Sequence, residues 1–384
     1  MGREPTAIPS PAARTIRSTP RRTSADAGDG EGLASDLCRW FASARRDLPW
    51  RRTRDPYAIW VSEIMLQQTR VETVIPYYQR FLARFPDVAS LAAAPLEEVL
   101  AAWAGLGYYR RARHLAAGAR EVVTRYGGKL PADPRALSSL SGIGRYTAGA
   151  IASIAFEVQA PLVDGNVARV LARVFGIEEP VDAPRTVNKL YELAASLVPS
   201  ERPGDFNQAL MELGATICTP APRCALCPLA RRCVALASGR ERELPVSLKK
   251  KISPRIELTA ALFEEGGRVL MAKRPVTGIF AEMWEPPLVE ARGARARALF
   301  AGAGIVVPAR ARAIGEHKHV LTHRVLEVSA VRATLTKLTV LDPYLEMRLC
   351  DRGELAKLPT STFARTLLAM LGEDHPEHGR KRAR

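Results

Sequence analysis

Two carboxylates in the first half of the chain are placed where they could cleave a glycosidic bond. Glu63 is a lone acid in an otherwise apolar and amide-rich segment. Burial there would raise its pKa and make it a general acid near neutral pH. Asp164 lies at a predicted helix start, where the helix dipole would keep a carboxylate ionised beside a cationic sugar transition state. Each also has an ordinary interpretation, because Glu63 could lie on a solvated face and Asp164 could be a simple N-cap.

Four of the six cysteines form a compact metal-binding pattern, Cys218-x5-Cys224-x2-Cys227-x5-Cys233. Four thiolates in so short a span suit either a cubane iron–sulfur cluster or a tetrahedral zinc ion. Zinc sites more often pair two CxxC units, and this segment has one, which favours the cluster over zinc and over unmetallated thiols. The cysteines are not spread along the chain, so no secreted disulfide framework is expected.

A glycine turn between two predicted helices is a candidate phosphate site. Gly142 and Gly144 would let the backbone approach a ligand closely, and the free N–H groups of the next helix would point at an anion. An ordinary turn between antiparallel helices is the alternative. The 56 Lys and Arg residues against 40 Asp and Glu give a net charge of +16, which favours a DNA phosphate. The same charge could also serve solubility alone.

The elements that must position these groups change character along the chain. From about Leu33 to Leu236 the pattern is helical, and Asp55-Pro56 opens the helix that carries Glu63. This part is predicted to be all-α, with two lobes and a cleft between them. Beyond it, Ile256–Phe263 and Val269–Ala272 are predicted as partner strands around a turn, and Val320–Ala330 as a further strand, which indicates an α+β unit.

The length of 384 residues predicts several domains. We expect a disordered basic tail over 1–30, a helical domain over 31–237 with the cysteine loop at 218–233, a charged linker over 238–255, an α+β domain over 256–372 and a basic tail over 373–384. No apolar run is long enough for a membrane span, and the N-terminus lacks the apolar core of a secretory signal. A reducing cytoplasmic compartment is therefore expected.

Six sequence segments, taken in their order along the chain, resemble motifs of the adenine DNA glycosylase (MutY) family of the helix-hairpin-helix superfamily. The resemblance spans about Leu33 to Leu371, and it rests on Leu48-Pro49-Trp50-Arg51, Ser62–Thr69, Gly105-Leu106-Gly107-Tyr108-Tyr109, the glycine hairpin, Val163–Val167 and the cysteines. It implies an all-α helix-hairpin-helix DNA glycosylase domain with an iron–sulfur cluster loop, followed by an α+β Nudix-like (MutT-like) domain. It also implies a [4Fe-4S] cluster and a place in the bacterial cytoplasm, associated with the nucleoid. A monomer is expected, because nothing in the sequence marks an oligomer interface. The implied substrate is double-stranded DNA with adenine opposite 8-oxoguanine or guanine.

The resemblance also implies roles for individual residues. Glu63 would protonate the leaving adenine and later position or activate water, while Asp164 would stabilise the oxocarbenium-like sugar, with a transient covalent bond as one route. Tyr146 and Asn166 would support Asp164. The remaining residues would surround the flipped adenine (Trp50, Arg51, Gln208), wedge into the base stack (Gln68, Tyr108), or meet 8-oxoguanine (Thr69, Leu106 and the loop Leu321-Thr322-His323).

Several departures from related patterns refine these expectations. The endonuclease III group has lysine where this chain has Tyr146, which cannot form a Schiff base, so a monofunctional glycosylase is expected. The frame Arg297–Ile305 overlays the Nudix box, but Ala or Gly replaces each expected glutamate. Without those carboxylates a hard divalent metal lacks ligands, so this domain should bind rather than hydrolyse. The spacing between the first two cluster cysteines is one residue shorter than is usual in the family, a departure that bears on cluster loading. Leu321 replaces a usual Phe, which predicts retained but weaker lesion recognition.

Three alternatives stay open at this point. The first is a bifunctional endonuclease III-type glycosylase and lyase, which Tyr146 opposes. The second is a Nudix pyrophosphohydrolase with a DNA-binding extension, which the missing glutamates oppose. The third is a non-catalytic iron–sulfur DNA-binding protein, in which Glu63 and Asp164 would be ordinary helix residues.

Overall fold

The computed structural model describes residues 30–248 and 253–372. The first range is helical, as predicted, and contains no strand. Its elements are α1 (Gly30–Ala44), α2 (Pro56–Leu66), α3 (Val71–Arg84), α4 (Val88–Ala93), α5 (Leu96–Trp103), α6 (Arg110–Tyr126), α7 (Pro134–Ser138), α8 (Arg145–Phe156), α9 (Gly165–Phe175), α10 (Pro184–Leu197), α11 (Pro203–Thr216) and α12 (Val234–Ala237), with single 3-10 turns at Pro49–Arg51, Cys224–Leu226 and Ala230–Arg232. No helix within the described ranges is long and apolar enough to cross a membrane.

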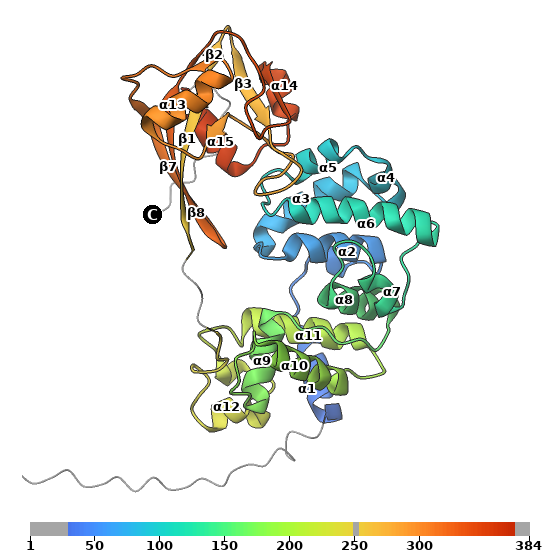
Figure 1. The fold of residues 1–384 in the computed structure, drawn as a ribbon. Helices are drawn as coiled ribbons and strands as arrows, with labels where there is room; N and C mark the ends of the chain where they lie inside the picture. Colours follow the sequence, from blue (N-terminus) through green and yellow to red (C-terminus); the bar gives the residue numbers. More distant parts are fainter. Residues whose placement is uncertain (1–29, 249–252, 373–384) are drawn as a thin grey trace, which may run out of the picture.

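The helices form two lobes, each with its own core (Figure 1). One core lies among α2 to α8, and the other lies among α1, α9, α10 and α11. Helix α8 serves both, because Ile151 packs in the first core and Ala150 in the second. The two expected lobes are therefore present, and α8 bridges them.

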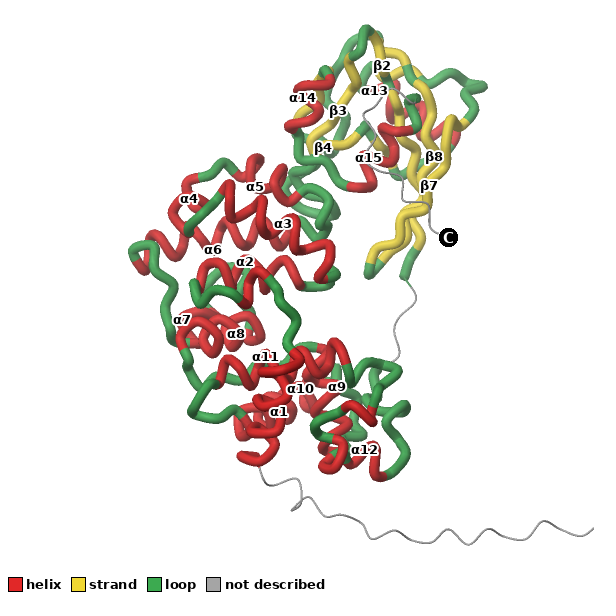
Figure 2. The backbone as a smooth tube through the Cα atoms, turned by 180° about the vertical axis from the view of Figure 1, so that it is seen from behind, coloured by secondary structure: helices red, strands yellow, loops and turns green. Residues whose placement is uncertain are grey.

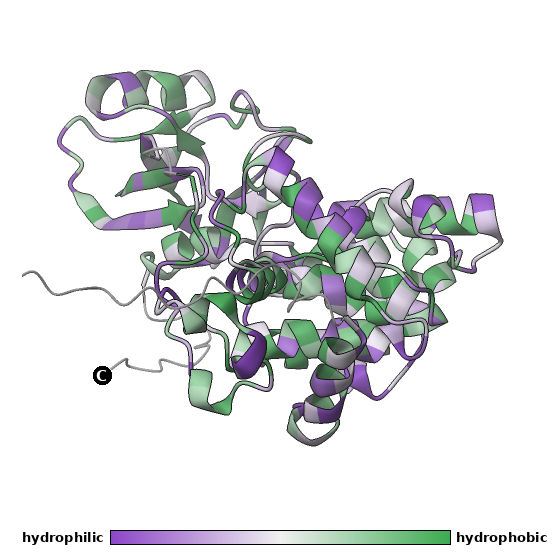
Figure 3. Cartoon of the chain, turned by 90° about the horizontal axis from the view of Figure 1, so that it is seen from below, coloured by the Kyte–Doolittle hydropathy of each residue, from purple (hydrophilic) through white to green (hydrophobic). Residues whose placement is uncertain are grey.

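Helix α2 is central to the first lobe. Asp55 caps it as predicted, since its carboxylate accepts hydrogen bonds from Tyr57 N at 3.1 Å and Ala58 N at 3.2 Å. Every residue from Tyr57 to Met65 is buried, so this helix has no solvated face. The hydropathy colouring in Figure 3 shows green apolar residues dominating the inner helices, while purple polar residues concentrate on outer turns.

The C-terminal part is an α+β unit. Its elements are β1 (Arg255–Leu262), β2 (Glu264–Glu265), β3 (Arg268–Lys273), β4 (Trp284–Glu285), β5 (Leu288–Val289), α13 (Gly293–Gly302), β6 (Ile305–Val306), β7 (Ala313–Leu321), β8 (Arg324–Arg332), β9 (Thr334–Leu335), β10 (Glu346–Cys350), α14 (Arg352–Lys357) and α15 (Thr362–Ala369). One sheet has the order β5-β1-β8-β7, with β1 parallel to β8, and a second has the order β10-β3-β2, with β4 also paired to β3. The short strands β6 and β9 pair separately.

Two strand predictions in this part were wrong. Strands β1 and β3 are not partners, because the chain passes from one sheet to the other at Phe263, and β3 pairs with β2, β4 and β10 instead. The segment Val320–Ala330 is not one strand, because β7 ends at Leu321 and β8 starts at Arg324. Its two-residue turn, Thr322 and His323, contains no glycine or asparagine to mark it in the sequence.

A loop between β3 and β4 holds the α+β unit against the first helical lobe. Met283 is fully buried in the core of that lobe, and the Phe280 ring lies 6.4 Å from the ring of Tyr109. The indole Nε1 of Trp284 donates to Glu97 Oε1 at 3.1 Å. With this contact in place, the β7–β8 hairpin extends away from its own sheet, down beside the helical lobes (Figure 2).

Some predictions concern residues outside the described ranges. These are the basic tails over 1–29 and 373–384 and the lysine run Lys249-Lys250-Lys251. The expected domain boundaries at residues 237 and 255 stay predictions.

Candidate active site

A cavity of about 540 Å³ lies between the two helical lobes. Helix α2 and the loop after it line it from the first lobe, and the start of α9 together with α11 lines it from the second. Nine of the residues singled out in the sequence meet there: Trp50, Arg51, Glu63, Gln68, Thr69, Tyr146, Asp164, Asn166 and Gln208. The volume is in the range that holds a small organic group, such as a single nucleobase.

Glu63 is the buried carboxyl of this cavity. Its side chain is only 6% exposed, and it accepts one hydrogen bond, from the Tyr146 hydroxyl to Oε2 at 2.7 Å. Burial raises the pKa of Glu63 to about 7, the Tyr146 hydrogen bond opposes that rise, and the nearby charge of Asp164 adds to it. The interpretation of Glu63 as a solvated surface acid is therefore wrong, and the group can hold a proton at neutral pH.

Asp164 lies across the cavity as the N-cap of α9. Its Oδ1 accepts from Val167 N at 2.7 Å, and its Oδ2 accepts from Asn166 Nδ2 at 3.2 Å. Burial raises the pKa of Asp164, and the two hydrogen bonds work against that rise. Arg169 in turn donates to Asn166 Oδ1 at 2.8 Å, which fixes the amide. Asp164 is thus both a helix cap and a carboxylate of the cavity.

The structure also shows two cavity residues that the sequence analysis missed, Arg46 and Glu212. Glu212 lies on α11 and is 1% exposed. Its carboxylate accepts hydrogen bonds from Arg46 Nε at 2.7 Å and Arg46 Nη2 at 2.8 Å, and from Arg51 Nη2 at 2.8 Å. These three side chains form the Glu212 cluster. Burial alone would raise the pKa of Glu212, but these hydrogen bonds outweigh it and lower the pKa to about 2. Glu212 is a lone acid among apolar residues, the same signal that identified Glu63.

The remaining predicted base-contact residues lie on loops next to the cavity rather than in it. Leu106 and Tyr108 belong to the loop between α5 and α6. Arg111 Nη2 donates both to the Gly107 carbonyl of this loop and to Thr69 Oγ1. Tyr108 is 49% exposed, and its hydroxyl lies 2.9 Å from Thr322 Oγ1 in the turn of the β7–β8 hairpin. Leu321 and His323 flank Thr322 there.

The glycine hairpin packs against α6. Gly142 has a φ of +81°, and a Cβ there would lie 2.8 Å from the Cβ of His114, so glycine is required. Gly144 is the N-cap of α8 and has open space around it. Glu121 accepts from Ser141 N at 3.1 Å and from Ser141 Oγ at 2.5 Å, which holds the turn in place.

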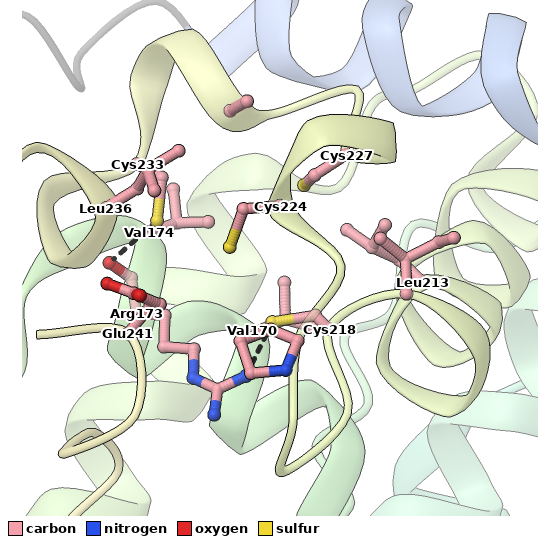
Figure 4. Close-up of a pocket in the computed structure, with 13 residues that line it drawn as sticks. Val170, Arg173, Val174, Leu213, Cys218, Cys224, Cys227, Cys233, Leu236 and Glu241 are labelled. Atoms are coloured by element: carbon pink, nitrogen blue, oxygen red, sulfur yellow. Dashed lines mark hydrogen bonds between the residues drawn. The ribbon is translucent and has the colours of Figure 1, made fainter. Parts of the chain in front are cut away.

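The four clustered cysteines surround a second, smaller cavity in the other lobe. Figure 4 shows the sulfur atoms of Cys218, Cys224, Cys227 and Cys233 facing one space. The buried Arg173 reaches the same space and donates to Cys218 Sγ at 3.3 Å. Within the described ranges, no three His, Cys, Asp or Glu side chains converge on a point that would hold a single metal ion.

Comparisons with known proteins assign both parts of the chain. Residues 61–195 match the family described as HhH-GPD superfamily base excision DNA repair protein, and residues 258–370 match the NUDIX domain. The chain is 40% identical over 360 residues to the adenine DNA glycosylase of Homo sapiens, covering 78% of this chain and 66% of that protein. It is 45% identical over 197 residues to the adenine DNA glycosylase of Mycolicibacterium smegmatis, covering 51% of this chain and 67% of that protein.

Among solved structures, a thermostable thymine-DNA glycosylase superposes with a TM-score of 0.52 at 32% identity, covering 56% of this chain and all of that chain. The match to the human relative spans just under two thirds of that protein's length. The expected fold class, a helix-hairpin-helix domain followed by a Nudix-like domain, is confirmed. The individual site roles stay predictions.

The Glu212 cluster allows a stability prediction. Glu212→Gln should lower the free energy of unfolding at pH 7 by on the order of 3 kcal/mol, because it leaves two guanidinium groups without their buried partner. The pKa of Glu212 in the folded state is lowered from 4.5 to about 2, so its contribution is complete above pH 4.5 and is lost as the pH falls toward 2. The difference in unfolding free energy between wild type and Glu212→Gln, measured by chemical denaturation, should therefore shrink as the pH is lowered from 4.5 toward 2. Glu98→Gln, which removes an exposed partner of Arg84, is the control and should change stability little. Equal stability of Glu212→Gln and wild type at pH 7 would contradict the prediction.

Proposed function

Because the chain belongs to the adenine DNA glycosylase family, we propose that it removes mispaired adenine from double-stranded DNA by hydrolysing the N-glycosidic bond. The observation that carries the proposal is the pairing of Glu63, protonated near neutral pH, with Asp164 in one cavity between the lobes. Cleavage of a glycosidic bond needs a proton donor for the leaving group and a negative charge beside the sugar.

The chemistry requires the adenine to leave the base stack and enter the cavity. There Trp50, Arg51 and Gln208 would surround the base. Trp50 is held edge-on to Tyr78, with ring centroids 5.5 Å apart, so it offers a rigid apolar wall. Arg51 is held by Glu212, so its donors are oriented before the base arrives.

Proton transfer would run from Glu63 to a ring nitrogen of the adenine. Tyr146 occupies Oε2, which leaves Oε1 as the oxygen that carries the proton. As the bond to the base breaks, positive charge develops on the sugar, and Asp164 would stabilise it while Asn166 and the α9 N-terminus hold the carboxylate. Glu63, now ionised, would activate or position the water that completes the hydrolysis.

The reaction would stop at base removal. A lyase step needs an amine that forms a Schiff base with the sugar. Tyr146 lines the cavity, and no lysine is among the lining residues that the structure describes. We therefore propose a monofunctional enzyme.

Recognition of the base opposite adenine would use both domains. The hydrogen bond between Tyr108 and Thr322 joins a loop of the helical domain to the tip of the β7–β8 hairpin. Thr69 and Leu106 lie on the adjoining loops, and the same guanidinium contacts both. We propose that 8-oxoguanine is read where these segments meet, which favours A:8-oxoguanine over A:G.

We further propose that the four-cysteine cavity holds a [4Fe-4S] cluster. The residues fit this group, because four thiols face one space, and their spacing with a single CxxC unit favours a cluster over a zinc ion. The guanidinium of Arg173 supplies a buried positive charge and a hydrogen bond to one sulfur, which would offset the negative charge of a thiolate-bound cluster. Such a group would tie the loop 218–233 to α9 and α11.

Glu63→Gln tests the proposed acid. Single-turnover cleavage of an A:8-oxoguanine duplex, followed by alkali, should be at least about 100-fold slower than wild type. Only the protonated form of Glu63 is an acid, so the wild-type rate should fall as the pH rises through about 7. Glu98→Gln, at an exposed ion pair, should match wild type. Without alkali the strand should stay intact, and borohydride should trap no covalent adduct. Full activity of Glu63→Gln, or a trapped adduct, would contradict the mechanism.

Thr322→Ala tests the reading of 8-oxoguanine. The loss of one hydrogen bond should reduce the ratio of A:8-oxoguanine to A:G cleavage rates about fivefold, the equivalent of roughly 1 kcal/mol. The rate of A:G cleavage itself should stay unchanged. Thr336→Ala, in a different loop of the same domain, is the matched control. A ratio unchanged from wild type would rule out this contact as a source of preference.

Metal analysis of the purified protein tests the cluster. About four iron and four sulfide ions per chain are expected, with visible absorbance that Cys224→Ala abolishes and Cys38→Ala preserves. One zinc ion per chain and no sulfide would instead support a zinc site.

A further inference from the structure

The Arg111 side chain links the two loops that carry the predicted wedge residues. Arg111 is on α6, and its Nη1 donates to three carbonyls at the end of α2: Ile64 at 2.7 Å, Met65 at 2.9 Å and Gln67 at 2.6 Å. Its Nη2 donates to Thr69 Oγ1 at 3.1 Å, and also to the carbonyls of Leu106 at 3.4 Å and Gly107 at 3.1 Å. One guanidinium therefore spans the loop 67–69 and the loop 105–109.

The position of Arg111 has a clear electrostatic cause. Helix α2 ends at Leu66, and the last carbonyls of a helix have no partner within it and carry partial negative charge. The guanidinium caps these carbonyls and lies 5.4 Å from the ring centroids of both Trp103 and Tyr108. No ion pair of the described residues includes Arg111, so carbonyl dipoles and ring faces stabilise its charge. Burial lowers its pKa to about 10, which leaves it charged at neutral pH.

Both loops hold a non-glycine residue in a strained conformation. Gln68 has a φ of +56° and Tyr108 a φ of +50°, in the left-handed region that such residues rarely adopt. Gln68 lies between two atoms that Arg111 holds, Gln67 O and Thr69 Oγ1, and Tyr108 directly follows a third, Gly107 O. Strained backbone of this kind persists only where the surroundings fix it.

We propose that Arg111 is a positioning residue that fixes the two loops relative to each other, so that Gln68 and Tyr108 meet the duplex together as a preformed wedge. This inference rests on the proposed function, because the wedge acts only on duplex DNA from which adenine is extruded. Ordering the two loops before binding removes an entropy cost from the extrusion step. The planar guanidinium presents Nη1 and Nη2 at a fixed separation, which the single ammonium of lysine cannot reproduce.

The test compares Arg111→Lys with Arg120→Lys. Arg120 lies on the same helix and donates to Ala92 O and Ala94 O, both at 3.3 Å, at the end of α4, so it has the same chemistry away from the wedge. Single-turnover excision is measured on adenine opposite guanine, where no 8-oxoguanine contact contributes, and on adenine opposite an abasic site, where extrusion costs less. Arg111→Lys should slow the first at least tenfold and the second less than threefold. Arg120→Lys should stay within twofold of wild type on both.

Two further readouts separate positioning from general destabilisation. The pH midpoint of excision should be unchanged in Arg111→Lys, because Glu63 is untouched. Arg111→Lys should also have a smaller effect in a Tyr108→Ala background, since it acts through that side chain. Equal slowing on both substrates, or full additivity with Tyr108→Ala, would overturn the inference while leaving the proposed function intact. A wild type that excises adenine from neither substrate would overturn both.

If Arg111→Lys does not fold, hydrogen exchange on the wild-type protein decides. The amides of Thr69 and Leu106, which bond to Leu66 O and Trp103 O, should be protected in the free protein. Exchange at the rate of an open loop in both would overturn the inference.

Discussion

The burial of one carboxyl group, that of Glu63, sets the requirements for the rest of the structure. A carboxyl loses its solvation when it is buried and keeps its proton unless a cation or several donors compensate. Here only the Tyr146 hydroxyl donates to it, so the proton stays available near pH 7. This depends on α2 being enclosed on all sides, with Asp55 capping its start and Arg111 capping its end. An exposed α2 would make Glu63 an ordinary surface acid.

Three carboxyl groups share the cavity, and their neighbours shift the pKa values of Glu63 and Glu212 in opposite directions. Two arginines donate to Glu212 and keep it ionised far below neutral pH, while no arginine of the described residues donates to Glu63, which titrates near neutrality. Burial raises the pKa of Asp164 as well, and the hydrogen bonds from Val167 N and Asn166 work against that rise. Environments that separate the pKa values of neighbouring carboxyls are how one site obtains both an acid and an anion. Glu212 contributes to the site indirectly, because its carboxylate orients Arg51 toward the proposed base pocket.

The two domains meet through a few specific contacts that place the hairpin beside the cavity. Met283 and Phe280 insert into the helical lobe, and Trp284 bonds to Glu97 across the interface. These contacts bring Thr322, more than 200 residues away in sequence, to 2.9 Å from Tyr108. The same loop that presents Tyr108 is held to the end of α2 by Arg111. A path of direct contacts therefore connects the hairpin tip to the helix that carries Glu63.

Local sequence patterns determined the features that depend on neighbouring residues. The cap at Asp55, the helical first part and the four-cysteine spacing all follow from residues a few positions apart, whereas the roles predicted for Glu63 and Asp164 rest on the resemblance of the whole set of motifs. The pairing of strands did not, because β1 and β3 lie close together in the sequence yet belong to different sheets. The sequence did not indicate the hairpin turn at Thr322 either, because this turn lacks the glycine or asparagine that usually marks a tight turn. Arg46, Arg111 and Glu212 have surface-type side chains whose partners lie up to 166 residues away, so only the tertiary structure shows what they hold. Charge and hydrogen bonding act through space, and the fold alone decides which groups come within their range.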